Sequence, residues 1–153
     1  MLKIADSAPD FTLPSVEGGD ITLSSLRPSP VVLFFYPRDN TPGCTLEARA
    51  FSALLEDFKT LGAQIFGISK DSLKKHSNFR TKQGLTVPLL SDAQGKVCQD
   101  YGVWGEKKLY GKVFLGIIRT TVLIDSSGKV ASIWPKVKVE GHAEDVLNAV
   151  RAL

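Results

Sequence analysis

The sequence predicts an α/β fold in which helices flank a central mixed sheet. A run of apolar and aromatic residues over 31–36 shows no alternation with polar residues, which is typical of a strand buried on both faces. A segment with helical periodicity follows over 42–61, and a second apolar run covers 64–69. This strand–helix–strand order predicts two parallel strands joined by a right-handed crossover.

The composition predicts one domain over residues 1–153, a length that can bury a proper core. Hydrophobic residues make up 43% and charged residues 23% of the chain, which argues against disordered, collagen-like and coiled-coil architectures. The formal net charge is only +3 and the basic residues are scattered, so we expect no nucleic-acid partner. No apolar run could span a bilayer, and residues 1–11 lack the apolar core of a secretory signal. We therefore expect a cytoplasmic protein with no membrane partner.

An N-terminal β-hairpin is expected ahead of the buried strand. Residues 11–13 and 20–23 alternate apolar and polar side chains on either side of a Glu-Gly-Gly turn. The buried strand over 31–36 follows and leads directly into Pro37. The hairpin is therefore an extension that precedes the strand–helix–strand unit.

The first long helix is expected over residues 42–61. Its apolar residues lie three or four positions apart, which is the period of a helix. They are Leu46, Ala50, Leu54, Phe58 and Leu61. Pro42 suits the first turn of a helix, and Gly62 suits its C-terminal end. The strand over 64–69 then completes the unit.

The rest of the chain predicts further helices, a short strand and a second hairpin. We expect helices over 72–83, 94–101 and 142–153, a strand over 87–90, and hairpin strands over 119–124 and 129–134. The four glycines within residues 102–116 indicate a loop. This order of elements matches a thioredoxin-like fold with an N-terminal β-hairpin extension.

The loop after the buried strand delivers Cys44 to the first turn of the predicted helix. Unpaired backbone N–H groups and the helix dipole at that position favour the thiolate over the thiol. The thiolate is the form that attacks electrophiles, so a reactive Cys44 is the leading hypothesis. The alternative is that Cys44 is a small buried hydrophobic residue. The other cysteine is Cys98, and two cysteines in this pattern make neither a disulfide framework nor a zinc site.

Four stretches of the sequence resemble the peroxiredoxins. The first is Pro37-x-x-x-Thr41-x-x-Cys44, which is similar to the peroxiredoxin active-site motif. Three more resemble the branch called peroxiredoxin Q or bacterioferritin comigratory protein. They are Tyr36-Pro37 through Pro42-Gly43-Cys44-Thr45-x-Glu47, Gly102-Val103-Trp104-Gly105-Glu106-Lys107 and Gly116-Ile117-x-Arg119-Thr120-Thr121. The similarity extends from about Pro9 to the final helix, and thus over nearly the whole chain.

The resemblance implies a thiol-dependent peroxidase that reduces hydrogen peroxide and organic hydroperoxides. The Cys44 thiolate would attack the peroxide and become a sulfenic acid. This chemistry uses no metal, haem or flavin, so we expect no cofactor and no metal site. Thioredoxin, glutaredoxin or a small thiol would supply the electrons. Relatives are monomers or dimers, and we expect a monomer.

The resemblance also implies that Arg119 and Thr41 act at the reacting sulfur. Arg119 would add a permanent positive charge near Cys44 and a fork of donors for the peroxide oxygens. The Thr41 hydroxyl would accept a hydrogen bond from the peroxide or donate one to the thiolate. The alternatives are a surface ion pair for Arg119 and a helix N-cap for Thr41, which is compatible with the first role.

Pro37 is the fourth residue that we expect in the catalytic set, and Pro42, Gly43 and Glu47 would support the site. Pro37 and Pro42 would exclude water from the pocket without adding competing donors. The backbone N–H groups of Gly43 and Cys44 would point at the reacting atoms. Glu47 follows Cys44 by about one helical turn, so it would orient the catalytic arginine, although its charge would repel a thiolate if unpaired.

The sequence lacks a cysteine at both positions where many relatives carry the one that resolves the sulfenic acid. These positions hold Arg49 and Arg80. We therefore predict a one-cysteine cycle in which an external thiol reduces the oxidised Cys44. Cys98 is expected to pack in the interior. The alternative is that Cys98 acts as the resolving cysteine after a movement that brings the two Cα atoms within ~7 Å.

Two other functions would use the same cysteine. A thioredoxin-like disulfide reductase needs a second thiol beside Cys44, and the sequence has no C-x-x-C motif. A non-enzymatic redox sensor or chaperone, in which oxidised Cys44 alters a partner surface, is the alternative from another class. The rate of reaction with peroxide would separate a sensor from an enzyme.

The histidines and tryptophans are expected to have structural roles. His76 and His142 are predicted on a polar helix face or at a helix start, with no second metal ligand nearby. Trp104 and Trp134 are expected to pack rather than to form a binding platform.

Overall fold

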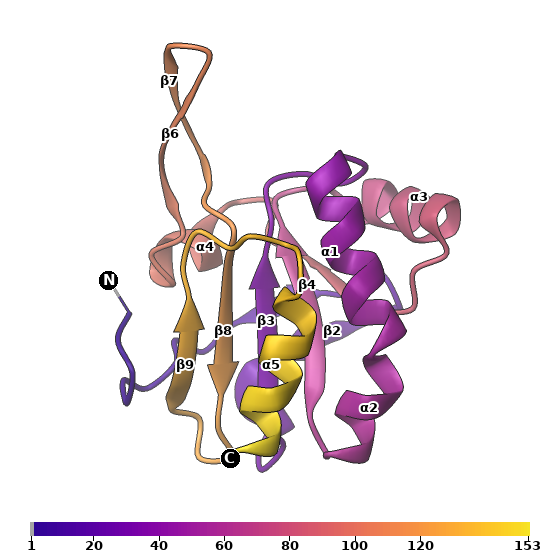
Figure 1. Ribbon diagram of the computed structural model, residues 1–153, viewed down its shortest axis with the longest axis vertical. Coiled ribbons are helices and arrows are strands. Elements are labelled where there is room, and N and C mark those ends of the chain that lie inside the picture. Colours follow the sequence, from indigo (N-terminus) through magenta and orange to yellow (C-terminus); the bar gives the residue numbers. More distant parts are fainter. Residues whose placement is uncertain (1) are drawn as a thin grey trace.

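A five-stranded sheet lies at the centre of the computed structural model, which describes residues 2–153 (Figure 1). Its strands, in spatial order, are β5 (Leu89–Ser91), β4 (Gln64–Ser69), β3 (Val31–Phe35), β8 (Thr120–Ile124) and β9 (Val130–Trp134). β4 is parallel to both β3 and β5, whereas β8 is antiparallel to β3 and β9. The sheet is therefore mixed, and the predicted thioredoxin-like arrangement is confirmed.

The remaining elements surround this sheet. The N-terminal hairpin is β1 (Thr12–Pro14) and β2 (Asp20–Thr22), followed by a short 3-10 helix, Leu23–Leu26. The other helices are α3 (Leu73–Gln83), α4 (Lys96–Asp100) and α5 (His142–Arg151). Ser72 caps α3, because its hydroxyl accepts a hydrogen bond from the Lys75 backbone N–H at 3.2 Å. Among the described residues, no helix is long and apolar enough to cross a membrane.

The helix predicted over 42–61 is interrupted, so the prediction of one continuous helix is wrong. It consists of α1 (Pro42–Ala53) and α2 (Leu55–Thr60). Leu54, between them, has φ −99° and ψ 4°, and its N–H is shared between the carbonyls of Ala50 (3.3 Å) and Phe51 (3.2 Å). This tightened turn redirects the chain. The predicted apolar face is also only partly correct: Phe58 is buried, but Leu46 and Leu61 are 60% and 39% exposed, and Phe51 and Leu55 are buried instead.

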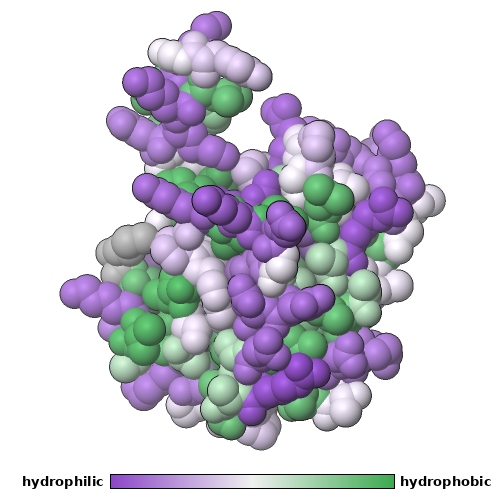
Figure 2. Space-filling model, in the orientation of Figure 1, coloured by the Kyte–Doolittle hydropathy of each residue, from purple (hydrophilic) through white to green (hydrophobic). Residues whose placement is uncertain are grey.

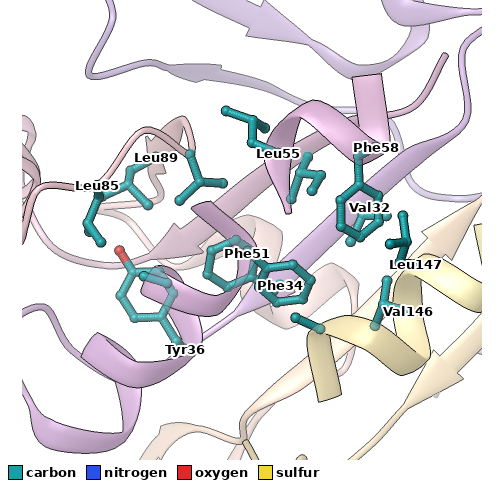
Figure 3. Close-up of a cluster of buried hydrophobic side chains, with 14 of the residues drawn as sticks. Val32, Phe34, Tyr36, Phe51, Leu55, Phe58, Leu85, Leu89, Val146 and Leu147 are labelled. Carbon is teal, nitrogen blue, oxygen red and sulfur yellow. The ribbon is translucent and has the colours of Figure 1, made fainter. Parts of the chain in front are cut away.

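Alternate residues of β3 face two separate apolar clusters, one on each side of the sheet. Phe34 joins the cluster beneath α1, α2 and α5, where it stacks on Phe51 with ring centroids 4.6 Å apart (Figure 3). Leu33 joins the cluster on the other side, with the N-terminal segment and α4. Cys44 belongs to the first cluster and Cys98 to the second. The sheet therefore lies between the two cysteines.

The segment predicted as a loop over 102–116 is instead an antiparallel hairpin that stands away from the body of the molecule (Figure 1). It consists of β6 (Trp104–Leu109) and β7 (Lys112–Ile117). The turn residues Tyr110 and Gly111 have φ values of 52° and 76°, the left-handed pair that joins tight hairpins. The loop prediction is wrong because Gly105 and Gly116 face each other across the ladder, where glycine is compatible with a strand.

Candidate active site

The first turn of α1 places Cys44 in a buried position behind the loop that follows β3. The residue is 1% exposed, and it occupies the third position of the helix. Thr41 precedes the helix with extended backbone and makes no side-chain cap. Its hydroxyl donates to the Arg38 carbonyl at 2.9 Å. Because the single hydroxyl proton is used there, the oxygen of Thr41 is left as an acceptor on the site.

Arg119 reaches this helix turn from the other end of the chain. It precedes β8, and the register of β8 on β3 pairs Thr120 with Phe35, so Arg119 lies beside the point where β3 ends. Its Nη2 donates to the Sγ of Cys44 at 3.2 Å, and its Nη1 donates to Oε1 of Glu47 at 2.8 Å. The side chain is only 17% exposed, so the pair is not a surface ion pair. One guanidinium thus contacts both the sulfur and the carboxyl group.

Glu47 is the buried partner of the arginine. It is 1% exposed, and among the described residues its Oε2 has no hydrogen-bond partner. Burial raises the pKa of Glu47 to about 7, although the charge and hydrogen bond of Arg119 act in the opposite direction. Burial also opposes the charge of Arg119, but attraction to Glu47 and Cys44 raises its pKa above the ordinary value. The arginine therefore stays charged while the glutamate titrates near neutral pH.

The titration of Glu47 is expected to make stability depend on pH. Its pKa is raised from 4.5 to about 7, so the folded protein binds this proton more tightly than the unfolded chain. The stabilisation is complete below pH 4.5 and is lost as the pH rises through about 7, which amounts to about 3 kcal/mol. Urea unfolding across this range, compared between the native protein and Glu47→Gln, measures it. Parallel curves for the two proteins would contradict the assignment.

The two prolines and the glycine of the motif occupy different environments. Pro37 is half-buried at the rim of the site, whereas Pro42 is exposed on the first turn of α1 rather than enclosed in the pocket. A Cβ atom on Gly43 would lie 3.1 Å from Nη2 of Arg119. Glycine therefore leaves room for the guanidinium at the helix turn. As first-turn residues, Gly43 and Cys44 have N–H groups without helical acceptors.

A buried polar network, which the sequence analysis missed, holds the active-site loop against α3. Asp39 in this loop accepts a hydrogen bond from the Tyr36 hydroxyl at 2.6 Å and lies 2.7 Å from Nδ1 of His76. His76 is fully buried, and its Nε2 lies 2.9 Å from the Leu90 carbonyl. Both ring nitrogens therefore lie within hydrogen-bond distance of protein oxygens. The expected position of His76 on a polar helix face is therefore wrong, because the side chain points into the core.

The second histidine is also internal. His142 begins α5, and its Nε2 lies 2.8 Å from the Thr121 hydroxyl. Burial lowers the pKa of His142 to about 4, with a further contribution from the charge of Arg119. The side chain is thus neutral at physiological pH, in keeping with a structural role.

Comparison with known proteins identifies the chain. The model of the AhpC/TSA family matches residues 4–133. The chain belongs to this family. Peroxiredoxin Bcp of Xanthomonas campestris is 48% identical over 95% of the chain and 92% of the relative, and peroxiredoxin Bcp of Escherichia coli K12 is 40% identical over 96% and 94%. The chain is therefore a peroxiredoxin, and a thiol peroxidase, of the branch that the sequence resembled.

Solved structures agree with this assignment. The bacterioferritin comigratory protein of Xanthomonas campestris superposes with a TM-score of 0.90 at 43% identity, covering 99% of this chain and 97% of that one. PrxQ of Xylella fastidiosa gives a TM-score of 0.93 at 39% identity, with the same coverage of both chains. The peroxiredoxin Q likeness thus extends to the whole backbone.

The second cysteine of this peroxiredoxin is remote from the first. Cys98 is fully buried in α4, and its backbone N–H donates to Oδ2 of Asp92 at 2.8 Å. Burial raises the pKa of the Cys98 thiol far above its ordinary value, and the neighbouring Asp92 raises it further. Both cysteines are free thiols. Arg49 is exposed on α1, and Arg80 on α3 pairs with Glu17 at 3.3 Å. The structure does not bring Cys98 or either arginine to the site.

Proposed function

We propose that Cys44 is the peroxidatic cysteine and that this peroxiredoxin reduces hydrogen peroxide and organic hydroperoxides in a one-cysteine cycle. The observation that carries the proposal is the Arg119 guanidinium, which contacts Sγ of Cys44 at 3.2 Å and Glu47 at 2.8 Å. The solved Xanthomonas campestris relative is described by its alkyl peroxide reduction activity, which supports organic hydroperoxides as substrates here.

In the oxidative step, the Cys44 thiolate attacks one peroxide oxygen and the O–O bond breaks. The departing oxygen takes a proton and leaves as water or an alcohol, and Cys44 becomes a sulfenic acid. Arg119 stabilises the negative charge as it moves from sulfur to oxygen. Thr41 accepts the peroxide O–H, because its own proton is donated to the Arg38 carbonyl. Pro37 adds a wall that offers no donor to compete for the peroxide.

In the reductive step, an external thiol attacks the sulfenic acid, which releases water and leaves a mixed disulfide on Cys44. A second thiol then attacks the sulfur of the bound thiol, which expels the Cys44 thiolate and releases the disulfide of the two external thiols. The position of Cys98 on the other face of the sheet supports this route. An internal disulfide would require Cys44 or Cys98 to leave its apolar cluster and reach the other side of the sheet. Thioredoxin, glutaredoxin or a small thiol each balances the cycle. The cycle needs the residues of only one copy of the chain, which fits a monomer. A cycle that depends on free thiols suits a reducing compartment such as the cytoplasm.

Mass spectrometry after one equivalent of peroxide, in the presence of a sulfenic-acid trap, tests this cycle. We expect the trap on Cys44 and an unmodified Cys98, because the sulfenic acid meets no internal thiol. A disulfide between the two cysteines would contradict the one-cysteine cycle. Oxidation of Cys44 no faster than that of free cysteine would instead favour a redox sensor over an enzyme.

A further inference from the structure

An open groove of about 800 Å³ lies beside the active site, between the β6–β7 hairpin and the body of the molecule. Pro37 and Thr41 of the active-site loop line it at one end, and the hairpin and residues 70–75 form its walls. Figure 2 shows the notch that separates the hairpin from the rest of the surface, with hydrophilic side chains along its borders. A molecule in this groove would therefore have one end at the Cys44 loop.

The groove carries a concentrated positive charge. Its lining includes the cations Arg38, Lys70, Lys75 and Lys107 and a single carboxylate, that of Asp71. This formal +3 equals the net charge of the entire chain, which has 19 basic and 16 acidic residues. The rest of the molecule is thus formally neutral, whereas the groove carries an excess of positive charge that favours an anionic ligand.

The lone carboxylate in the lining is already occupied by protein donors. Oδ2 of Asp71 accepts hydrogen bonds from the Asp39 backbone N–H and the Ser69 hydroxyl, both at 2.8 Å. Its Oδ1 lies 4.0 Å from Nζ of Lys75. Asp71 therefore fastens the loop, and its charge offsets only one of the four cations in the lining.

Lys107 joins the groove to the catalytic charges. It is half-buried, and its Nζ donates to the Ile117 carbonyl at 3.0 Å. Burial lowers the pKa of Lys107, as does the charge of Arg119, whereas the charge of Cys44 raises it. Lys107 thus lies within electrostatic range of the reacting sulfur. Lys70 extends from the opposite wall toward the hairpin, where its Nζ lies 4.4 Å from the centroid of the Trp104 ring. This cation–π contact holds a second cation in the groove.

The hairpin wall of the groove also offers apolar surface. Residues that face each other across an antiparallel ladder share one face, so Phe114 lies beside Lys107, and Leu109 two positions further is on that face as well. Leu109 and Phe114 are 55% and 44% exposed. A ligand that combines a carboxylate with a short organic body would meet both kinds of surface.

We propose that this groove binds the carboxylate end of a small anionic thiol and thereby presents its sulfur to oxidised Cys44; the inference rests on the one-cysteine cycle proposed above. Such a cycle requires two thiols to arrive in succession and a disulfide to leave, which suits an open groove. Hydrogen peroxide carries no charge and gains nothing from four cations. The cations of the groove would attract a carboxylate-bearing thiol such as glutathione in each of the two steps that consume a thiol. The disulfide that is released carries the same carboxylates.

The reductive step, measured alone, tests the proposal. The protein is oxidised with one equivalent of hydrogen peroxide, and the decay of the sulfenic acid is then followed with glutathione or with uncharged 2-mercaptoethanol. In the double variant Lys70→Gln/Lys75→Gln, we expect the ratio of the glutathione rate to the 2-mercaptoethanol rate to fall about fivefold. The matched control is Lys59→Gln, an exposed lysine on α2, which should leave this ratio unchanged. In the native protein the ratio should also fall as salt is raised from about 0.05 to about 0.5 M.

Three results would overturn the proposal. The ratio could be the same in the double variant and the native protein. The charge effect could arise in the oxidative step, as a preference for carboxylate-bearing over uncharged hydroperoxides. Small thiols could fail to reduce the sulfenic acid while thioredoxin succeeds. Formation of the sulfenic acid on Cys44 is observed before any thiol is added, so failure of the groove is distinguishable from failure of the peroxidase assignment.

Discussion

Replacement Cys44→Ser is expected to abolish peroxide-dependent turnover, with a loss of at least about 10⁴-fold in kcat/KM. Serine has the shape of cysteine with a smaller oxygen in place of sulfur, so it fits the same buried position at the start of α1. Its hydroxyl stays protonated at neutral pH and cannot form a sulfenic acid. Peroxide consumption in the presence of a small thiol measures the effect, and circular dichroism verifies that the fold is retained.

The same substitution at the second cysteine provides the matched control. Cys98→Ser places a hydroxyl in the opposite apolar cluster, which costs about 1–3 kcal/mol of unfolding free energy. Repeated turnover with an external thiol should continue, because Cys98 does not reach the site. Loss of repeated turnover with retention of the first turnover would show that Cys98 resolves the sulfenic acid after all.

The second large effect is expected at Arg119. Arg119→Ala should lower kcat/KM about 10²–10³-fold, because it removes the donor that lies 3.2 Å from Sγ of Cys44. It also leaves the carboxyl of Glu47 buried without its partner. Arg119→Lys retains the charge, but a single ammonium group cannot reproduce the two-armed contact with sulfur and carboxylate. We therefore expect the lysine variant to lie between the native protein and the alanine variant in peroxide kinetics.

A double variant separates catalysis from stability at this position. In Arg119→Ala/Glu47→Gln the buried group is neutral, so part of the lost unfolding free energy should return. The rate constant for oxidation by peroxide should not return with it, because the donor to sulfur is still missing. Recovery of both quantities together would mean that Arg119 only supports the fold.

The sequence predicts the elements whose signals are local and misses those that depend on partners. The buried run of β3 and the cysteine at the start of α1 are adjacent in the chain, and they appear in the structure as predicted. The apolar face predicted for the helix is not the buried one, because Leu46 is 60% exposed whereas Phe51 is fully buried. Leu54 keeps the apolar period of a helix, so nothing local marks the break there. Glycine is common both in loops and in tight hairpins, so the glycines of residues 102–116 do not distinguish the two.

The residues of the site also fall into those with a local sequence signal and those that only the folded sheet brings together. Pro37, Thr41 and Cys44 form one short motif, but Arg119 follows Cys44 by 75 positions, and only the family resemblance pointed to it. The physical reason for its position is the pairing of β8 with β3, which no local pattern encodes. The contact of Asp39 with His76 likewise depends on how α3 packs beside the loop. Long-range contacts of this kind are set by the assembled sheet rather than by neighbours in the chain.

The hairpin has a consequence for how this enzyme can change over evolutionary time. It forms a two-stranded sheet of its own, and the chain enters and leaves it where Ile118 donates to the Val103 carbonyl at 2.7 Å. Most of its residues lie outside both apolar clusters, so mutations there leave the buried contacts of β3 and β8 intact. Mutations can therefore change the surface that the hairpin presents to the groove, while the cysteine and its arginine remain under separate constraint.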